Sequence, residues 1–366
     1  MSLKTKRFAI FVPNMAGGGA ERAALQLAEG LAHRGFDVDL VLAAAEGPRM
    51  SEVPDTVQLI DLQARRVLSS LPALVRYLRR ARPDGMASFL NHANIVALWA
   101  RRLAGCPKRL LIIEQNNLSE ASGRGKSPLD RMMPWIMKRF YPWADYVIGV
   151  SAGVLADLRG TIGTVPDDRF RVIYNVVVTP DMLEAAKAPV DHPWFENPEP
   201  VFVAAGRLRP QKDFPMLIRA FARLRSTRRA RLLILGEGPD RADLECLIEE
   251  LGLSEDVEMP GHIDNPYPFF SRAHAFVLSS RWEGLPTVLI EALGCGARVI
   301  ATECPSGPRE ILADGRYGRL VPVGDEAAMA SALEAAMDGE ILRPPNDSWT
   351  PYMVDAVVDD YIDAFT

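Results

Sequence analysis

Two doubly wound α/β domains, each built on a parallel sheet, are the fold that this 366-residue sequence predicts. Three observations lead to this prediction. The length exceeds the size at which a single hydrophobic core usually stops growing. Short apolar runs alternate with helical stretches, as strands and helices do in a parallel sheet. The alternation stops in a proline-rich segment and then begins again. One large α/β barrel is the alternative that these observations leave open.

The first domain is expected over residues 1–180. Residues 8–12 form an unbroken apolar run, typical of a buried parallel strand, and three glycines at 17–19 follow it. Residues 20–33 then carry apolar side chains at helical spacing. Ser151 is a suitable N-cap for a later helix. Further strands are expected at residues 38–43, 86–90, 110–114 and 146–150.

The second domain is expected over residues 200–350, after a linker at 181–199. Five prolines and several acidic residues, with little periodicity, lie between residues 180 and 200. Strands are expected next at residues 200–205, 232–235, 275–278 and 299–300, with helices at 214–225, 242–251 and 287–293. The final helical stretch, 351–366, is a candidate to pack back on the first domain.

Composition excludes several classes of protein. With 48% hydrophobic and 24% charged residues, the chain is globular and not disordered. Its four cysteines lie far apart without C-x-x-C pairs, which indicates neither a disulfide framework nor a zinc site. No stretch approaches the roughly 20 apolar residues of a membrane span, and the first apolar run is too short for a signal peptide. We therefore expect a cytoplasmic protein, soluble or peripheral on the inner face of the cell membrane.

The net charge of −5 combines two halves of opposite sign. Residues 1–190 hold 25 Lys and Arg against 18 Asp and Glu, whereas residues 191–366 hold 17 against 29. This asymmetry favours a partner that meets only the first half, and we expect contact with an anionic membrane. Residues 129–143 fit an interfacial helix or a core helix with a solvated basic face. Nucleic-acid binding is not expected, because no known module surrounds the basic residues. The basic clusters are Arg65, Arg66, Arg76, Arg79, Arg80, Arg82; Arg101, Arg102, Lys108, Arg109; and Arg124, Lys126, Arg131, Lys138, Arg139.

Loops that follow the strands are where open parallel sheets bind ligands. The first loop, with Gly18 and Gly19, lacks the G-x-G-x-x-G pattern, so it supports NAD binding only weakly. A tight turn, an acceptor contact and a donor-phosphate contact all stay open for it. A second loop places Arg207 and Lys212 between a strand and a helix start, which suits a diphosphate; a solvated loop is the alternative.

The most informative segment spans residues 283–291. Glu283 lies in a loop before a proline-initiated helix, whose first amides can bind phosphate oxygens. Glu291 lies eight residues later among apolar neighbours, where an unpaired carboxylate would be costly to bury. Carboxylates accept hydrogen bonds from paired hydroxyls, such as those of a sugar ring and a ribose. The residues expected at the site are Glu283, Gly284, Leu285, Pro286, Thr287 and Glu291.

The order of these motifs resembles that of the retaining family-4 glycosyltransferases. Residues 283–291 are similar to the family's E-x7-E motif, and residues 206–212 resemble its diphosphate loop. The likeness spans nearly the whole chain and includes residues 17–22, 151–157, 172–175 and 304–310. It implies the GT-B fold, in which two Rossmann-like domains face a central cleft, with the acceptor on the first domain and a nucleotide-sugar donor on the second.

The resemblance also implies roles for individual residues. Arg207 and Lys212 would neutralise the leaving diphosphate, Glu283 would hold donor-sugar hydroxyls, and Glu291 would hold the ribose. Residues 257–262 would flank the base. Gly18, Gly19, Gly236 and His262 complete the expected donor-binding set.

The acceptor side departs from the family pattern. Many relatives carry a basic residue, often histidine, in the loop where Glu114, Gln115 and Asn116 stand here. Gln115 cannot replace that charge. His92 is an alternative acceptor-side residue, together with Gln115 and Asn116, although a structural role for a lone histidine stays open.

The activity implied is retaining transfer of a hexose or N-acetylhexosamine to a saccharide or lipid-linked saccharide, in cell-envelope glycan synthesis such as that of lipopolysaccharide. Residues 304–310 resemble enzymes that use UDP-linked sugars, so UDP is preferred to GDP. No metal or other cofactor is expected, because cations already face the diphosphate, and the D-x-D at residues 37–39 is interpreted as structural. The alternatives are a nucleotide-sugar epimerase and a non-catalytic sugar-nucleotide-binding subunit.

Overall fold

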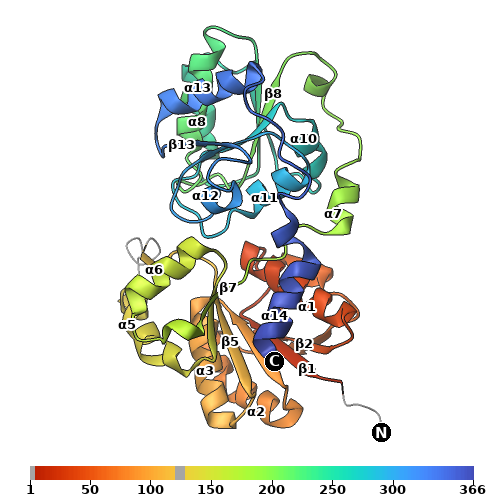
Figure 1. Ribbon diagram of the computed structural model, residues 1–366, viewed down its shortest axis with the longest axis vertical. Coiled ribbons are helices and arrows are strands. Elements are labelled where there is room, and N and C mark those ends of the chain that lie inside the picture. The colour runs from red at the N-terminus through yellow and green to blue at the C-terminus, as the bar shows by residue number, and fades with distance from the viewer. Residues whose placement is uncertain (1–4, 120–127) are drawn as a thin grey trace. The chain divides into compact units, whose positions relative to one another are not determined.

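The computed structural model describes residues 5–119 and 128–366, which form two compact units. Unit 1 comprises Met1–Val176 and Tyr352–Thr366, and unit 2 comprises Val177–Pro351 (Figure 1). Each unit contains one open parallel sheet, and in each the strand order reverses direction once. The prediction of two doubly wound α/β domains is therefore confirmed, and the single barrel is excluded.

Unit 1 holds a seven-stranded sheet in the order β3-β2-β1-β4-β5-β6-β7. Its central strands are buried on both faces, which explains their unbroken apolar runs. In register, Ile10 of β1 lies opposite Leu40 of β2 and Ala87 of β4. The strands are β1 (Arg7–Val12), β2 (Asp37–Leu42), β3 (Gln58–Asp61), β4 (Gly85–Phe89), β5 (Arg109–Glu114), β6 (Tyr146–Gly149) and β7 (Phe170–Val172).

The helices of unit 1 connect these strands. The expected cap is confirmed, since Ser151 Oγ accepts a hydrogen bond from the amide of Val154 at the start of α6. Short 3-10 helices complete the connections, among them η2 (Val67–Ser70), η3 (Tyr141–Trp143) and η4 (Asp167–Arg169). The α-helices are α1 (Gly19–His33), α2 (Leu71–Ala81), α3 (Asn91–Ala104), α5 (Pro128–Phe140), α6 (Ala152–Ile162) and α14 (Val354–Phe365). Of the basic positions named above, Arg124, Lys126 and the side chain of Arg131 lie outside the described residues.

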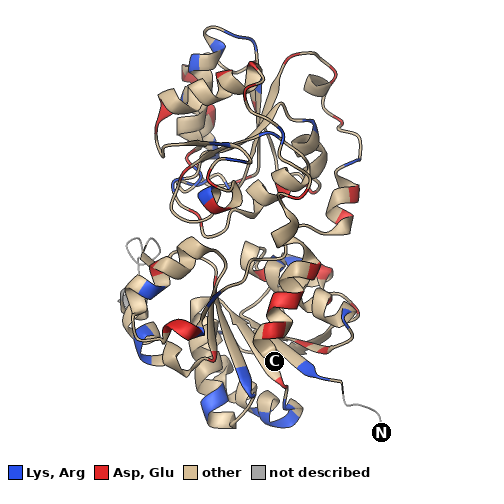
Figure 2. Ribbon diagram, viewed as in Figure 1, with Lys and Arg blue, Asp and Glu red and all other residues tan. Residues whose placement is uncertain are grey.

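The C-terminal helix α14 is part of unit 1. Phe365 stacks on Phe8 of β1, with ring centroids 4.4 Å apart and planes inclined by 16°. Gly30 of α1 allows close packing, because a Cβ there would lie 2.5 Å from a methyl carbon of Val358. The helix brings four Asp and no cation, while residues 1–176 hold 24 Lys and Arg against 16 Asp and Glu (Figure 2). The positive excess of unit 1 is thus smaller than the sequence halves indicate.

The D-x-D segment lies within β2, away from the strand's carboxyl end. Asp39 is buried, accepts a 2.6 Å hydrogen bond from the Tyr77 hydroxyl and lies 3.8 Å from a nitrogen of Arg7. Asp37 lies 3.7 Å from the same guanidinium. These contacts connect β1, β2 and α2, which is a structural role.

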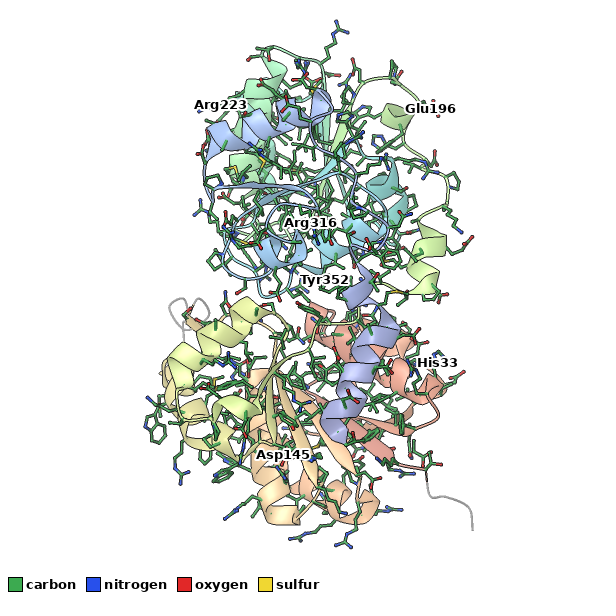
Figure 3. The ribbon with its side chains drawn as sticks, viewed as in Figure 1. His33, Asp145, Glu196, Arg223, Arg316 and Tyr352 are labelled. Atoms are coloured by element: carbon green, nitrogen blue, oxygen red, sulfur yellow. The ribbon has the colours of Figure 1, made fainter. Side chains whose placement is uncertain are left out.

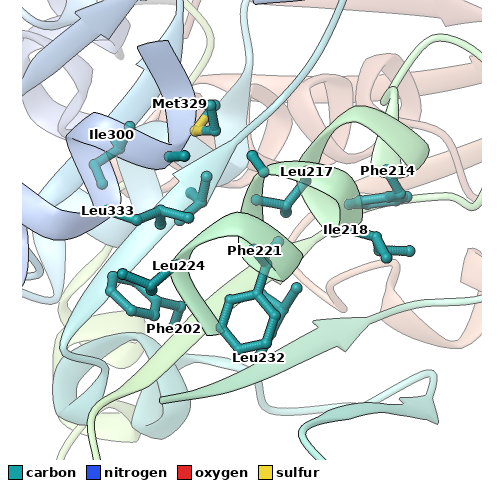
Figure 4. Packing of buried hydrophobic residues seen from close by; sticks show 14 of the residues in the cluster. Phe202, Phe214, Leu217, Ile218, Phe221, Leu224, Leu232, Ile300, Met329 and Leu333 are labelled. Carbon is teal, nitrogen blue, oxygen red and sulfur yellow. The ribbon is translucent and has the colours of Figure 1, made fainter. Parts of the chain in front are cut away.

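Unit 2 holds a six-stranded sheet in the order β10-β9-β8-β11-β12-β13. Apolar side chains of α8 and α13 form a core with the sheet, including Phe202, Phe221, Leu224 and Leu333 (Figure 4). The strands are β8 (Val201–Ala205), β9 (Arg231–Leu235), β10 (Val257–Gly261), β11 (Ala275–Leu278), β12 (Val299–Thr302) and β13 (Arg319–Val321). The helices are α7 (Pro180–Ala185), α8 (Phe214–Arg225), α9 (Arg241–Glu250), α10 (Tyr267–Arg272), α11 (Thr287–Gly294), α12 (Pro308–Ile311) and α13 (Glu326–Met337).

Residues 181–199, expected as a linker, pack within unit 2. Pro180, just before this segment, begins α7, and Pro193 within it begins η5 (Pro193–Phe195), because proline suits a first helical position. Ser271 donates to the carbonyl of Ala186 at 3.1 Å, and the Phe195 and Phe269 rings pack edge to face. Among the helices of the described residues, none is long and apolar enough to cross a membrane.

Candidate active site

The candidate donor site lies at the carboxyl ends of β8 and β11. These strands are neighbours although five elements separate them in the chain, and the strand order reverses between them. In doubly wound sheets, ligands bind in the crevice that opens at this reversal. The loop after β8 (residues 206–213) and the loop after β11 (residues 279–286) therefore hold the residues of interest.

Glycines let the loops after β8 and β9 pack backbone against backbone. Gly236 has a φ of 137°, and a Cβ there would lie 2.0 Å from the carbonyl oxygen of Gly206. A Cβ on Gly238 would lie 2.2 Å from the carbonyl oxygen of Leu208. The amide of Leu208 in turn donates to the carbonyl of Glu237 at 2.9 Å. Gly236 thus fixes the loop that carries Arg207 and Lys212, whereas its expected donor contact stays a prediction.

A buried ion pair joins the two principal loops. Lys212 Nζ lies 2.7 Å from Glu283 Oε1, and the two side chains are only 16% and 8% exposed. The same carboxylate accepts a 2.6 Å hydrogen bond from Ser280 Oγ, and Gln211 Nε2 donates to its other oxygen at 3.4 Å. Lys212 also packs its stem on Gly206, where a Cβ would lie 2.9 Å from Cε. The pair is therefore fixed in place before any ligand arrives.

Further contacts hold both loops in register. Arg281 forms an ion pair with the buried Asp213, with its Nε 2.7 Å from Oδ2. Ser279 Oγ donates to the carbonyl of Lys212 at 2.6 Å. Asp213 has a φ of 48°, a left-handed conformation that non-glycine residues seldom adopt, at the point where α8 begins. Backbone strain at such a place is typical of functional loops.

Helix α11 begins where the second loop ends. The first amides of any α-helix have no carbonyl within the helix to donate to, and this holds for α11. The residues before the helix, Gly284, Leu285 and Pro286, are buried. Glu291 is buried within the helix at 5% exposure. The loop after β12 packs against this start, because a Cβ on Gly307 would lie 2.3 Å from a Pro286 ring carbon.

Two thiols, the buried Cys304 and the half-buried Cys295, lie near the acids without being reactive. Burial, together with the Glu291 carboxylate, raises the pKa of Cys295 to about 12. Burial and the Glu283 carboxylate raise the pKa of Cys304 to about 12, although Lys212 opposes the shift. Both thiols therefore stay protonated near neutral pH and are poor nucleophiles.

Two expected donor residues are more exposed. Arg207 follows Gly206 on the β8 loop and its side chain is exposed. His262 lies at the end of the edge strand β10, with a side chain 76% exposed and 3.6 Å from Asp264. Strand β9 separates β10 from β8, so His262 is two strands away from the Lys212 loop. The structure brings Lys212 and Glu283 into contact, and the roles of Arg207, Glu291, Thr287 and His262 stay predictions.

The expected acceptor residues lie at the carboxyl edge of unit 1's sheet. Gly18 and Gly19, which were expected to contact the donor, begin α1 at the same edge, where a Cβ on Gly18 would lie 2.5 Å from Glu21 Oε2. Their donor contact stays a prediction. His92 is exposed in the first turn of α3, and Leu90 just before it has a φ of 76°, a strained value for leucine.

The loop after β5 is held by side-chain amides. Gln115 and Asn175 exchange two hydrogen bonds, of 3.1 Å and 2.8 Å, while Asn116 is exposed. A paired Gln115 holds the end of β5 next to the end of β7. Any acceptor contact of His92, Gln115 or Asn116 stays a prediction.

A buried acid next to this loop was missed by the sequence analysis. Glu114 is fully buried at the end of β5 and accepts hydrogen bonds from the Tyr141 hydroxyl and, at 2.9 Å, from Asn94 Nδ2. Burial raises the pKa of Glu114 to about 7, although both hydrogen bonds oppose the shift. Its partners are 20 and 27 residues away in sequence, so spacing alone gave no signal.

Comparisons with known proteins settle the family. The model described as "Glycosyltransferase Family 4" matches residues 17–180, and the model described as "Glycosyl transferases group 1" matches residues 191–349. The chain is a family-4 glycosyltransferase. The resemblance drawn from the sequence is therefore confirmed at the level of the family.

Two relatives match this glycosyltransferase over most of its length. It is 29% identical over 350 residues to the N-acetylgalactosamine-N,N'-diacetylbacillosaminyl-diphospho-undecaprenol 4-alpha-N-acetylgalactosaminyltransferase of Campylobacter jejuni, covering 92% of each chain. It is 28% identical over 332 residues to the lipopolysaccharide core biosynthesis glycosyltransferase LpsE of Rhizobium meliloti, covering 89% and 87%. Among solved structures, HepE of Anabaena in complex with UDP matches with a TM-score of 0.79 at 18% identity, covering 98% of this chain and 99% of HepE. That likeness supports the GT-B fold.

The arrangement in unit 2 suits a diphosphate ester of a sugar. Lys212 and Glu283 form one buried cluster beside the start of α11. Lys212 offers a positive charge for a phosphate, and Glu283 offers oxygens that can accept hydrogen bonds from sugar hydroxyls. The sequence analysis did not assign Ser280 or Gln211 to the glutamate. The position of Ser280, three residues before Glu283 and just after β11, was the signal that could have indicated this hydrogen bond. Within residues 5–119 and 128–366, no group of three or more His, Cys, Asp or Glu gathers as a metal site would.

Proposed function

We propose that this glycosyltransferase moves a hexose or N-acetylhexosamine, with retention, from a UDP-sugar to a saccharide or lipid-linked saccharide of the cell envelope. The buried Lys212–Glu283 pair at the strand-order reversal of unit 2 carries the donor part of this proposal. The relatives carry the acceptor part, because one is named for a diphospho-undecaprenol-linked substrate and another for lipopolysaccharide core synthesis. Structures of HepE with UDP support the choice of nucleotide.

On the donor side, charge complementarity assigns the groups. The amides at the start of α11, Lys212 and Arg207 stabilise the negative charge that develops on the leaving diphosphate. Glu283 already accepts two or more hydrogen bonds in a fixed orientation, so it can accept others from hydroxyls of the donor sugar. Glu291 binds the ribose hydroxyls. When a diphosphate binds, Lys212 shares its charge between Glu283 and the phosphate.

The bond changes need no protein nucleophile. The bond between the anomeric carbon and the diphosphate oxygen breaks, and the acceptor hydroxyl oxygen bonds to that carbon from the same face. The acceptor proton passes to an oxygen of the leaving diphosphate. Because Arg207 and Lys212 supply positive charge, we propose that transfer proceeds without a divalent metal, and full activity after treatment with EDTA is the expected result.

On the acceptor side, His92, Gln115 and Asn116 line the carboxyl edge of unit 1's sheet and are proposed to contact the acceptor saccharide. A lipid-linked acceptor requires that the enzyme work at a membrane, so we propose peripheral contact of unit 1 with the anionic inner face of the cell membrane. His92→Ala should raise the KM for acceptor more than the KM for donor. Equal KM values for acceptor in H92A and wild type would remove His92 from the acceptor site.

The decisive experiment is a transfer assay with a panel of UDP- and GDP-sugars and lipid-linked saccharides, using wild type and Glu283→Gln. This isosteric change keeps the shape but removes the charge, so turnover should fall by about 10- to 100-fold, the value of one or two charge-assisted hydrogen bonds. Unchanged turnover would remove Glu283 from the site. Conversion of the donor without an acceptor product would favour an epimerase, and donor binding without turnover would favour a non-catalytic subunit.

A further inference from the structure

A cavity at the opposite edge of unit 1's sheet takes no part in the proposed transfer. Its volume is about 540 Å³, and it is lined by the end of α3 and by the segments that precede β5, β6 and β7. These segments enter the strands at their amino ends, whereas the proposed acceptor loops leave the strands at their carboxyl ends. Asp145, labelled in Figure 3, is one of the lining residues.

The walls of the cavity are built by two arginines with fixed partners. Arg101 Nη1 lies 2.8 Å from Asp145 Oδ2, and the guanidinium also donates to the carbonyls of Trp143 and Lys108. Arg169 donates to two carbonyls at the end of η3, at 3.0 Å and 3.2 Å. These contacts fix the shape of the cavity, because they hold the three segments that line it together.

Two further cations line the cavity without compensation. Among the residues whose side chains the structure describes, no carboxylate forms an ion pair with Arg102 or Lys108, and both are exposed. The Arg102 guanidinium lies 5.6 Å from the ring centre of Trp143, and the Arg139 guanidinium lies 5.8 Å from the same centre. Asp145 is the one acid among the lining residues. Cations that converge on a concave, partly apolar surface attract anions strongly.

An apolar strip lies on α5, the helix that carries Arg139. On α5, the side chains of Met132 and Trp135 are 53% and 65% exposed, which are large fractions for apolar residues at a protein surface. They precede Arg139 by seven and four residues, so the helical period places all three on one face of α5. Arg139 lies near the cavity residue Trp143 and shares its helix face with Met132 and Trp135, an arrangement that suits a binding site for an amphiphilic anion.

We propose that this cavity binds a phosphate group, with Arg102 and Lys108 as its contacting cations. Guanidinium and ammonium groups are the usual partners of phosphate oxygens, and Arg101 and Arg169 keep the walls in position. The phosphate belongs either to an anionic lipid headgroup or to a free phosphate ester. The exposed Met132 and Trp135 on the helix face of Arg139 favour the lipid. The lipid source rests on the membrane contact proposed above, whereas the phosphate site itself does not rest on the proposed transferase activity.

The test compares two double variants of the full chain. Arg102→Ala with Lys108→Ala removes the contacting cations, and Arg76→Ala with Arg80→Ala removes the same charge from exposed positions of α2 outside the cavity. Binding of sn-glycerol 3-phosphate is measured by calorimetry. We expect saturable binding by wild type and by R76A/R80A, and at least a tenfold loss of affinity in R102A/K108A. No saturable binding by wild type, or equal affinities in all three proteins, would overturn the site.

Vesicles then identify the source of the phosphate. Co-sedimentation is measured with phosphatidylglycerol and phosphatidylcholine mixtures and with pure phosphatidylcholine. A larger loss of binding to the anionic vesicles in R102A/K108A than in R76A/R80A, with binding weakened in Trp135→Ala, supports the lipid headgroup. Site-dependent binding of glycerol 3-phosphate without site-dependent vesicle binding supports the free ester and excludes the headgroup. UDP binding to each variant is measured in parallel. It tests the proposed donor site of unit 2 independently of the phosphate cavity in unit 1.

Discussion

Lys212→Met is the sharpest test of the donor cluster, because the pair it breaks is mostly removed from water. The Lys212 and Glu283 side chains are 16% and 8% exposed, and their charged atoms lie 2.7 Å apart. Removing one partner of a buried pair costs about 3–5 kcal/mol, since the other charge stays buried. Ser280 and Gln211 still donate to Glu283, so we expect the lower end, about 3 kcal/mol of lost stability. Methionine keeps the stem that packs on Gly206.

A double-mutant cycle with Glu283→Gln isolates the pair. The double variant should recover about 1–2 kcal/mol relative to the sum of the single changes, because no unpaired charge is left. Urea unfolding of the full chain is followed by hydrogen exchange of peptides from β8 and β11, so that unit 2 is reported separately.

A surface pair of the same residue types is the matched control. The Lys187 and Glu184 side chains are 71% and 73% exposed, and Lys187→Met should change stability by no more than about 0.5 kcal/mol. If the Lys212 and Glu283 changes add within about 0.3 kcal/mol, the two side chains are uncoupled and the proposed cluster is refuted.

Three other outcomes are expected. Gly236→Ala should destabilise unit 2 by at least about 3 kcal/mol in urea melts, because its positive φ strains alanine and the new Cβ would lie 2.0 Å from the carbonyl oxygen of Gly206. Gly252→Ala is the control: this residue has a φ of 68° but open space around it, so the change should cost only about 1 kcal/mol. Burial raises the pKa of Glu114 from its ordinary 4.5 to about 7. Its contribution to the free energy of unfolding is therefore complete below pH 4.5 and falls by up to about 3 kcal/mol as the pH rises through 7. Glu114→Gln should remove this pH dependence from urea melts, and an unchanged pH profile would contradict the assignment. Phe365→Ala should cost unit 1 about 3–4 kcal/mol through lost packing on Phe8, and a loss below 1 kcal/mol by hydrogen exchange would show that α14 is dispensable.

The sequence predicted the strands that are buried on both faces but not the short edge strands β3, β7 and β13. Strands β1 and β8 read as apolar runs because helices cover both sides of them. Strand β3, by contrast, is an edge strand with four largely exposed residues, Gln58–Asp61, and β7 and β13 have only three residues each. Such short, half-polar segments carry no periodicity that distinguishes a strand from a loop.

For the site, loop positions were predictable but contacts were not. Lys212 and Glu283 were identified because each follows a strand at the ligand-binding edge. Their contact depends on β8 lying next to β11, an arrangement that the order of elements along the chain does not contain. The same holds for Glu114, whose burial depends on Asn94 and Tyr141 from two other segments. Tertiary neighbours decide such roles, and local sequence does not report them.

The return of α14 to unit 1 has a consequence for the order of folding during synthesis. Unit 2 is continuous, from Val177 to Pro351, whereas unit 1 needs its last helix to cover β1 and α1. A ribosome therefore delivers every residue of unit 2 before it delivers the end of unit 1. Although N-terminal domains commonly fold first, here the second unit can reach its native state while the first still exposes the apolar surface around Phe8.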